Sequence, residues 1–183
     1  WKDPLTGRNP GRFRPRTRCS QSRQSQVKMA EHSYDVVIIG GGAAGSAAAL
    51  TLRQLGVQSV CIVEGSDFAE ARVGETIPPD TNLLLRELGV DRSFASQKHL
   101  PCYGSQSLWG GPQLGHNDFL TSPYGHGWHL DRAEFDRMIL AQAVAAGVTR
   151  MNARCDSVAC TKDRVSGILA GGQRIKAGTY IDA

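Results

Sequence analysis

Two short runs of consecutive hydrophobic, mostly β-branched residues lie in the first half of the chain. Residues 34–39 (YDVVII) and 59–63 (SVCIV) show no polar alternation, which is typical of strands buried on both faces. Between them, residues 43–55 are rich in alanine and leucine and contain no proline, and Gly56 follows, which predicts a helix. Two buried strands joined by one helix predict a parallel βαβ unit.

Two more helices are predicted further along the chain. Pro78 and Pro79 open a leucine-rich stretch that runs to Leu88 and stops at Gly89. Residues 131–146 begin with Asp131 and Glu134 in capping-box spacing. Apolar residues then recur at helical spacing: Phe135, Met138, Ile139 and Ala143.

The remaining segments predict short strands and turns. Residues 99–127 are rich in Gly, Pro, Ser and His, and the pair Gly171-Gly172 separates two β-like stretches. The whole pattern predicts an α/β fold, with a Rossmann-like βαβ unit in a parallel central sheet plus a β-meander. Tyr180 and Ile181 are typical of a central strand that begins there, so we expect the fold to be incomplete at the C-terminus of this chain.

Charge separates a tail from a body. The formal net charge is +4, yet residues 1–28 carry eight basic side chains and one acidic one, whereas the rest carries 13 basic and 16 acidic ones. The basic segment is rich in Gly, Pro, Ser and Gln and has little to bury, which predicts a disordered tail over residues 1–31, either non-native or a targeting segment. Residues 32–183 form the folded body, whose mildly acidic balance gives no reason to expect a nucleic-acid partner.

Composition also bears on the cellular setting. No apolar run approaches the roughly 18 residues of a membrane span, so no membrane partner is expected. Five cysteines without a CxxC pair favour reduced thiols and a cytoplasmic location. His116, His126 and His129 lie in loop-like and strand-like sequence without a matching carboxylate pattern, so no metal site is predicted.

A glycine motif stands directly between the first strand and the first helix. Gly40, Gly42 and Gly45 have the spacing G-x-G-x-x-G, in which the glycines allow a tight turn, close approach of a diphosphate and close helix–strand packing. Glu64 follows the second strand, about 20 residues on, where a carboxylate accepts hydrogen bonds from a ribose. FAD and NAD share this fingerprint, so a flavoenzyme and an NAD-dependent dehydrogenase both stay open at this point.

Two downstream segments complete a family resemblance. They are residues 72–79 (RVGETIPP) and 127–136 (GWHLDRAEFD), and they accompany residues 40–49 (GGGAAGSAAA). With them the chain resembles the FAD-dependent monooxygenases of the glutathione-reductase-type fold, on the branch that includes flavin-dependent (tryptophan) halogenases. The resemblance covers residues 33–183 and makes the body the N-terminal part of an FAD-binding domain.

The resemblance implies a set of cofactor-binding residues. Glu64 would hold the adenosine ribose, and Arg72 would lie near the phosphate or ribitol. Glu75 would lie near the flavin ring, and Arg132 would face the FAD side of the cleft. The residues implied to line the diphosphate are Gly40, Gly42, Ala43, Ala44 and Gly45. Solvated surface charges are the alternative for the two arginines, and a helix-terminal carboxylate is the alternative for Glu75.

The sequence also departs from the halogenase pattern. Halogenases carry a lysine after the second helix, but residues 104–109 (GSQSLW) contain none, and Lys98 lies earlier in a predicted loop. Of the halogenase motif W-x-W-x-I-P, only Trp128 is retained in residues 126–131 (HGWHLD). These departures argue against halogenation. Residues 99–110 (HLPCYGSQSLWG) and 125–132 (GHGWHLDR) more closely resemble halogenase-like flavoproteins that help to build protein-derived quinone cofactors in amine oxidases.

The activity that the resemblance implies is oxygenation through a flavin C4a-(hydro)peroxide. The substrate would be an electron-rich aromatic group, either a small molecule or peptide-borne, with electrons supplied by a flavin reductase or NAD(P)H. No catalytic residue is identified. Because the later part of such a fold is not in this sequence, we expect the chain to be an inactive piece of the enzyme. A non-catalytic flavoprotein fragment stays open as an alternative.

Overall fold

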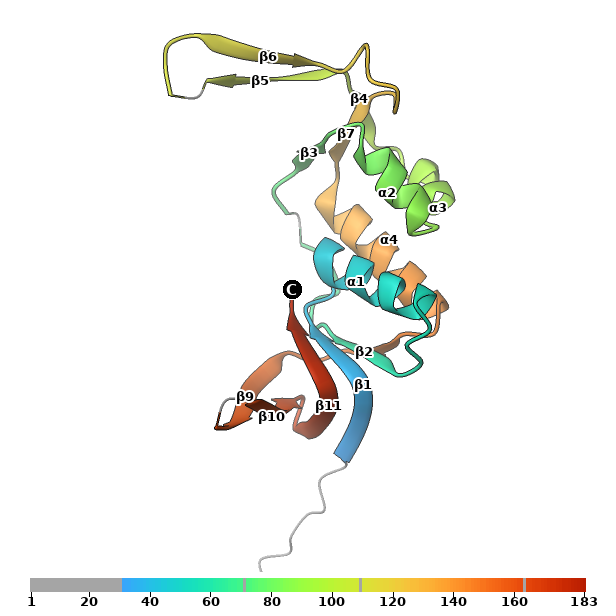
Figure 1. Cartoon of the computed structure of the whole chain (residues 1–183), viewed down its shortest axis with the longest axis vertical. Coiled ribbons are helices and arrows are strands. Elements are labelled where there is room, and N and C mark those ends of the chain that lie inside the picture. Colours follow the sequence, from blue (N-terminus) through green and yellow to red (C-terminus); the bar gives the residue numbers. More distant parts are fainter. Residues whose placement is uncertain (1–30, 71, 109, 163) are drawn as a thin grey trace, which may run out of the picture.

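The computed structural model describes residues 31–70, 72–108, 110–162 and 164–183, and the predicted tail lies outside them except for Glu31, which begins the first strand. Figure 1 shows the arrangement of the elements. They are β1 (Glu31–Ile39), α1 (Ala43–Gln54), β2 (Val60–Val63), β3 (Glu75–Ile77), α2 (Thr81–Glu87), α3 (Asp91–Ser96), β4 (Leu100–Cys102), β5 (Gly104–Leu108), β6 (Leu114–Asp118), β7 (Gly127–Leu130), α4 (Arg132–Ala145), β8 (Thr149–Met151), β9 (Cys155–Thr161), β10 (Arg164–Ala170) and β11 (Gln173–Asp182).

The main sheet has the strand order β8-β2-β1-β11-β10-β9. β8, β2, β1 and β11 run parallel, and β10 pairs antiparallel with both β11 and β9. The predicted βαβ unit, parallel sheet and β-meander are therefore confirmed. β11 is one strand of ten residues that pairs with β1 from Arg174 to Asp182, so Tyr180 and Ile181 lie near the end of a central strand and not at its beginning as predicted.

Each face of the main sheet buries a separate hydrophobic core. Side chains alternate along β1, so Val36 and Ile38 face the helices α1 and α4, while Val37 faces the meander side with Cys61 and Ile168. Ala49 of α1 and Ala143 of α4 are fully buried, and their small side chains let the two helices pack closely on the sheet. These helices hold the carboxyl ends of β1 and β2 in place, where the glycine motif and Glu64 lie.

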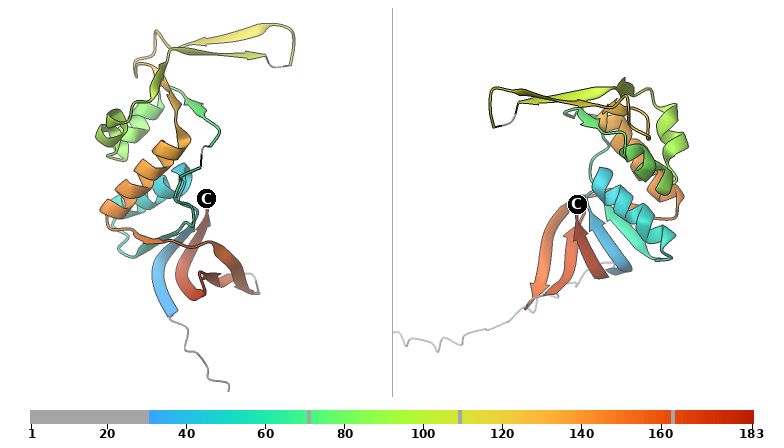
Figure 2. Two further views of the ribbon diagram at one scale, coloured as in Figure 1. Left: turned by 180° about the vertical axis from the view of Figure 1, so that it is seen from behind. Right: turned by 45° about the horizontal axis from the view of Figure 1, so that its top comes forward.

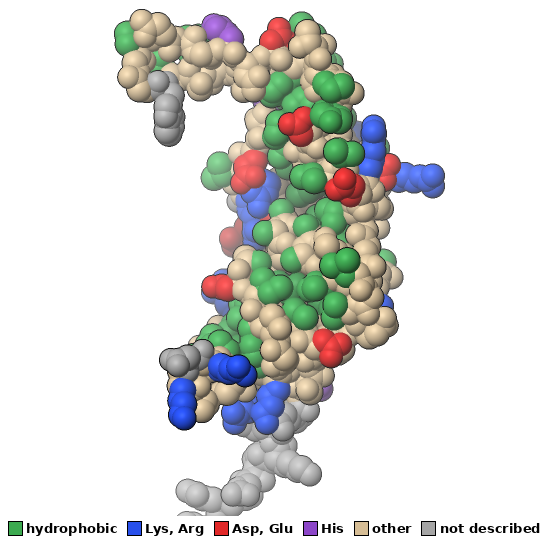
Figure 3. Space-filling model, viewed as in Figure 1, with side chains coloured by type: hydrophobic (Ala, Val, Ile, Leu, Met, Phe, Trp, Pro, Cys, Tyr) green, Lys and Arg blue, Asp and Glu red, His purple; other side chains and the backbone are tan. Residues whose placement is uncertain are grey.

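The second helix differs from its prediction in its buried face. α2 is shorter than the predicted stretch, and of its three consecutive leucines only Leu85 is buried. Leu83 and Leu84 are exposed, because three adjacent residues cannot all face one side of a helix. Leu55 and Val144 are exposed as well. Figure 3 shows hydrophobic side chains gathered over the helical layer.

Two small antiparallel sheets lie outside the main sheet. β3, β7 and β4 form one, and β5 and β6 form a hairpin that projects from the body (Figures 1 and 2). Every residue of β5 and β6 is exposed. Among the described residues, no helix is long and apolar enough to cross a bilayer.

Candidate functional site

The glycine motif forms a tight turn between β1 and α1. Gly40 has φ +104°, a backbone conformation that residues with a Cβ rarely adopt. Its N–H donates a hydrogen bond to the Val63 carbonyl oxygen at 3.0 Å. A Cβ on Gly45 would lie 2.0 Å from the Gly40 carbonyl oxygen, so the helix can approach the strand this closely only with glycine there. The turn thus places the N-terminus of α1 at the carboxyl end of the sheet.

The N-terminus of α1 is chemically open. Its N-cap residue is Gly42, which offers no side-chain hydrogen bond, and the first turn contains no acidic residue. A Cβ built on Gly42 would meet no atom within 4 Å. The first-turn N–H groups of Ala43, Ala44 and Gly45 therefore receive no acceptor from the cap residue, and the helix dipole favours a negatively charged group at this end.

Glu64 points its carboxylate at this turn. Its Oε2 accepts a hydrogen bond from the Gly41 N–H at 2.8 Å, and its Oε1 accepts one from the Ser66 N–H at 2.6 Å. Each carboxylate oxygen can accept a second hydrogen bond, so Glu64 retains acceptor capacity for the hydroxyl groups of a ligand. The sequence did not single out Gly41, yet a Cβ there would lie 2.8 Å from the Glu64 Cβ, and the run of three glycines is the signal.

Three predicted residues, Arg72, Glu75 and Arg132, come together around the buried Asp136. Arg72 donates from Nη1 to Asp136 Oδ2 at 3.0 Å, and Arg132 donates from Nη2 to the same oxygen at 3.2 Å. The Nη1 of Arg132 also pairs with Glu75. Asp136 is fully buried and was not predicted from the sequence, although its i,i+4 spacing from Arg132 was a usable signal.

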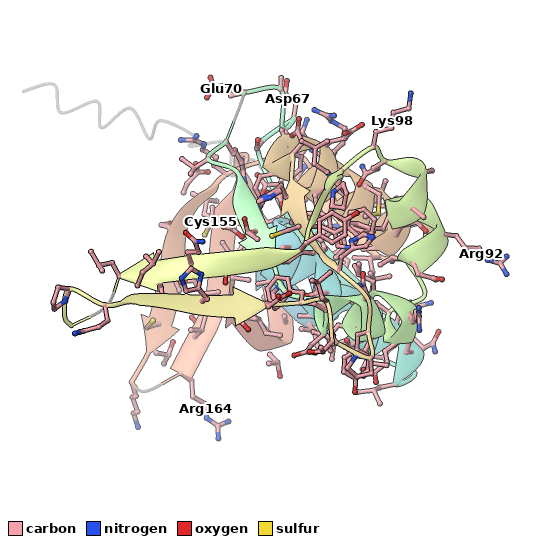
Figure 4. The ribbon with its side chains drawn as sticks, turned by 90° about the horizontal axis from the view of Figure 1, so that it is seen from above. Asp67, Glu70, Arg92, Lys98, Cys155 and Arg164 are labelled. Carbon is pink, nitrogen blue, oxygen red and sulfur yellow. The ribbon has the colours of Figure 1, made fainter. Side chains whose placement is uncertain are left out.

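The other singled-out residues lie apart from these groups. Lys98 sits between α3 and β4, and its side chain is exposed and points outward (Figure 4). His116 contacts Gln106 on the hairpin, and His129 contacts Thr76. Within the described ranges, no group of three or more His, Cys, Asp or Glu residues could hold a metal ion.

A buried histidine supports the start of α4, the helix that carries Arg132 and Asp136. Asp131 caps this helix by accepting from the Glu134 N–H at 3.1 Å, as the capping box predicts. His99 Nδ1 accepts from the Asp131 N–H at 3.3 Å, while its Nε2 bonds Gln97. Burial lowers the pKa of His99, although the negative charges of Glu134 and Asp131 oppose the shift.

This lowered pKa predicts a loss of stability in mild acid. In the unfolded chain His99 has a pKa of about 6.5, so it binds a proton more readily there than in the folded chain. The free energy of unfolding should therefore fall as the pH drops below about 6.5, until the folded pKa is passed. Urea unfolding between neutral and mildly acidic pH measures this slope. His99→Gln should flatten it, whereas His116→Gln on the exposed hairpin should not; equal slopes in the two variants would contradict the assignment to His99.

Residues 33–178 match the sequence profile of a protein family described as FAD binding domain. The putative FAD-dependent oxidoreductase LodB of Marinomonas mediterranea is 37% identical over 118 residues, which cover 64% of this chain and 32% of LodB. A 1H-pyrrole-2-carbonyl-(peptidyl-carrier protein) chlorinase of Pseudomonas fluorescens is 33% identical over 140 residues, which cover 65% of this chain and 31% of the relative.

Solved structures with the same fold include an FAD-dependent halogenase and a dihydroxylase. The myxobacterial chondrochloren halogenase CndH superposes with a TM-score of 0.73 at 25% identity, over 83% of this chain and 37% of CndH. The peptidyl tryptophan dihydroxylase QhpG, essential for tryptophylquinone cofactor biogenesis, gives a TM-score of 0.59 at 28% identity, over 82% of this chain and 32% of QhpG. The chain thus spans about a third of the length of the relatives that it matches.

Proposed function

The chain belongs to the FAD-binding domain family, and on that premise we propose that it forms the cofactor-binding part of an FAD-dependent monooxygenase of the halogenase-like branch. The observation that carries this proposal is the uncapped, acid-free N-terminus of α1, which lies next to the Glu64 carboxylate. A positive helix end beside a hydroxyl acceptor suits the diphosphate and ribose of one dinucleotide.

Each residue group has a distinct task in this proposal. The N–H groups of the first turn of α1 bind the diphosphate, and Glu64 accepts hydrogen bonds from the ribose. Arg72, Arg132 and Glu75 form the charged wall along the rest of the cofactor. The bound flavin supplies the redox chemistry and the activation of O₂, while the protein supplies orientation and electrostatics.

We propose oxygenation rather than halogenation as the outcome. Lys98 is exposed and points away from the body, and residues 104–108 of the hairpin contain no lysine. The chlorinase and QhpG act, by their names, on an aromatic group carried by a protein or peptide. An electron-rich aromatic group, peptide-borne or small, is therefore the proposed substrate, with a flavin reductase or NAD(P)H as electron source and the cytoplasm as location.

Titration with FAD tests the proposal on the product of the complete reading frame, called the full chain below. We expect visible flavin absorption at one FAD per chain, which excess NADH does not displace. Glu64→Gln should weaken FAD binding by about tenfold or more, because hydrogen bonds to a charged group contribute about 1.5–3 kcal/mol. The affinity follows from quenching of flavin fluorescence.

A charge-matched control separates a specific loss from a general charge effect. Glu70→Gln removes a carboxylate from the same loop, and the Glu70 side chain points outward (Figure 4). This variant should bind FAD as the unmodified chain does. A colourless full chain that binds NADH would instead favour a dehydrogenase and overturn the flavoenzyme proposal.

A further inference from the structure

A buried carboxylate lies at the centre of the charged wall, and the glycine motif does not explain it. The Asp136 side chain is 0% exposed, whereas the side chains of its partners Arg72 and Arg132 are 39% and 18% exposed. Burying a charge costs several kcal/mol unless partners compensate for the lost water. The guanidinium groups of Arg72 and Arg132 offset this cost. The Nε of Arg132 also lies 3.4 Å from Oδ1 of Asp136.

The pair with Arg72 links Asp136 to the loop of residues 64–74. This loop joins β2 to β3 and climbs past the start of α1 (Figures 1 and 2). The Arg72 guanidinium lies over the buried Phe68 ring, 4.9 Å from its centroid, and the Phe68 N–H donates to Ser66 Oγ at 2.9 Å. The Ser66 N–H in turn donates to Glu64. A continuous series of contacts therefore runs from the glycine motif to Asp136.

The pair with Arg132 links the same carboxylate to β3. Arg132 holds Asp136 through two of its nitrogens and Glu75, the first residue of β3, through the third. A planar guanidinium held on both sides has little freedom to rotate. The later end of the loop thus depends on Asp136 in two ways, because Asp136 holds Arg72 directly and holds the start of β3 through Arg132.

From this geometry we propose that Asp136 is a positioning residue for the cofactor site. Its carboxylate fixes Arg72 and Arg132 and so holds the β2–β3 loop beside the N-terminus of α1. Asp136 acts through the two arginines and does not itself contact the cofactor. The proposal rests on the proposed function of the site as an FAD site, and it adds the residue that keeps this site in shape.

Asp136→Asn tests the proposal in the full chain with two readouts. Asparagine keeps the shape of the side chain but removes the charge that pairs with Arg72 and leaves Arg132 with Glu75 as its acidic partner. FAD affinity should fall by about tenfold or more. In the FAD-free chain, amide hydrogen exchange in the β2–β3 loop should also become faster by about tenfold. Glu134→Gln, which removes an exposed carboxylate from the same helix, should change neither readout by more than about twofold.

A double-mutant cycle separates positioning from mere stabilisation. If Asp136 acts through Arg72, then Arg72→Gln should weaken FAD binding on its own, yet change it by less than about twofold once Asp136 is asparagine. Independent effects that multiply would overturn the proposal, as would a loop that exchanges at the unmodified rate in Asp136→Asn. A faster loop with unchanged FAD affinity would overturn the link to the cofactor.

The two readouts also distinguish this proposal from the proposed function. If the unmodified full chain binds no FAD, the flavoenzyme assignment fails, and so does the cofactor role of Asp136. The hydrogen exchange of the FAD-free chain still shows, in that case, whether Asp136 holds the loop. Should Asp136→Asn fail to fold, Arg72→Gln supplies the same test from the exposed side of the pair, with a faster loop and weaker FAD binding expected.

Discussion

Gly42→Ser is expected to stabilise the folded chain slightly and to weaken FAD binding by about a hundredfold, or about 2.7 kcal/mol. Serine is a better N-cap than glycine by a few tenths of a kcal/mol, because its hydroxyl accepts from the N–H groups of the first turn. The backbone at Gly42, with φ −69° and ψ −166°, accommodates serine without strain. The same hydroxyl would occupy the donors, and the open space, that the diphosphate requires.

The opposite signs of the two effects make this experiment decisive. Urea unfolding of the FAD-free full chain gives the stability, and fluorescence titration gives the affinity. Gly45→Ala is the matched comparison for stability. The Cβ of the alanine would lie 2.0 Å from the Gly40 carbonyl oxygen, so this variant should lower the free energy of unfolding by about 1–3 kcal/mol. If Gly42→Ser binds FAD like the unmodified chain, the diphosphate does not lie at α1.

The glycine motif could be predicted from sequence because its causes are local. A strand, a turn and a helix follow one another within residues 34–55, and each is recognisable from its own composition. The cap of α4 is local in the same way, since Asp131 and Glu134 are three residues apart. Hydrophobic runs also determined the parallel pairing of β1 and β2, because two buried strands around one helix leave few other arrangements.

The charged wall could be predicted only in part, because tertiary packing brings it together. Arg72 and Asp136 are 64 residues apart, and nothing near either residue indicates that they pair. A lone aspartate on a helix usually faces solvent, so its burial depends on how α4 packs against the β2–β3 loop. The short helix α3 was missed for a related reason: with six residues it has little periodicity of its own.

The largest loss of stability is expected from Phe68→Ala. Phe68 lies in the β2–β3 loop, between Glu64 and the Arg72–Asp136 ion pair. Phe68 is 1% exposed and belongs to the core beneath α1 and α4. Truncating a buried phenylalanine to alanine costs about 3–5 kcal/mol, a large share of the stability of an ordinary domain. Its ring also supports the Arg72 guanidinium, so the loop should lose this anchor as well.

A comparison with Phe68→Gly separates the ring from the backbone. Phe68 has φ +54°, a left-handed conformation that costs a residue with a Cβ about 1–2 kcal/mol and costs glycine almost nothing. Both variants lose the ring, but only alanine keeps the backbone cost, so Phe68→Gly should unfold at a higher urea concentration than Phe68→Ala. If glycine is the worse of the two, the left-handed backbone at residue 68 does not carry the expected cost. If alanine costs less than about 1 kcal/mol, packing of this ring does not hold the loop. In that case the ion pairs of Asp136 would have to hold the loop without the help of Phe68.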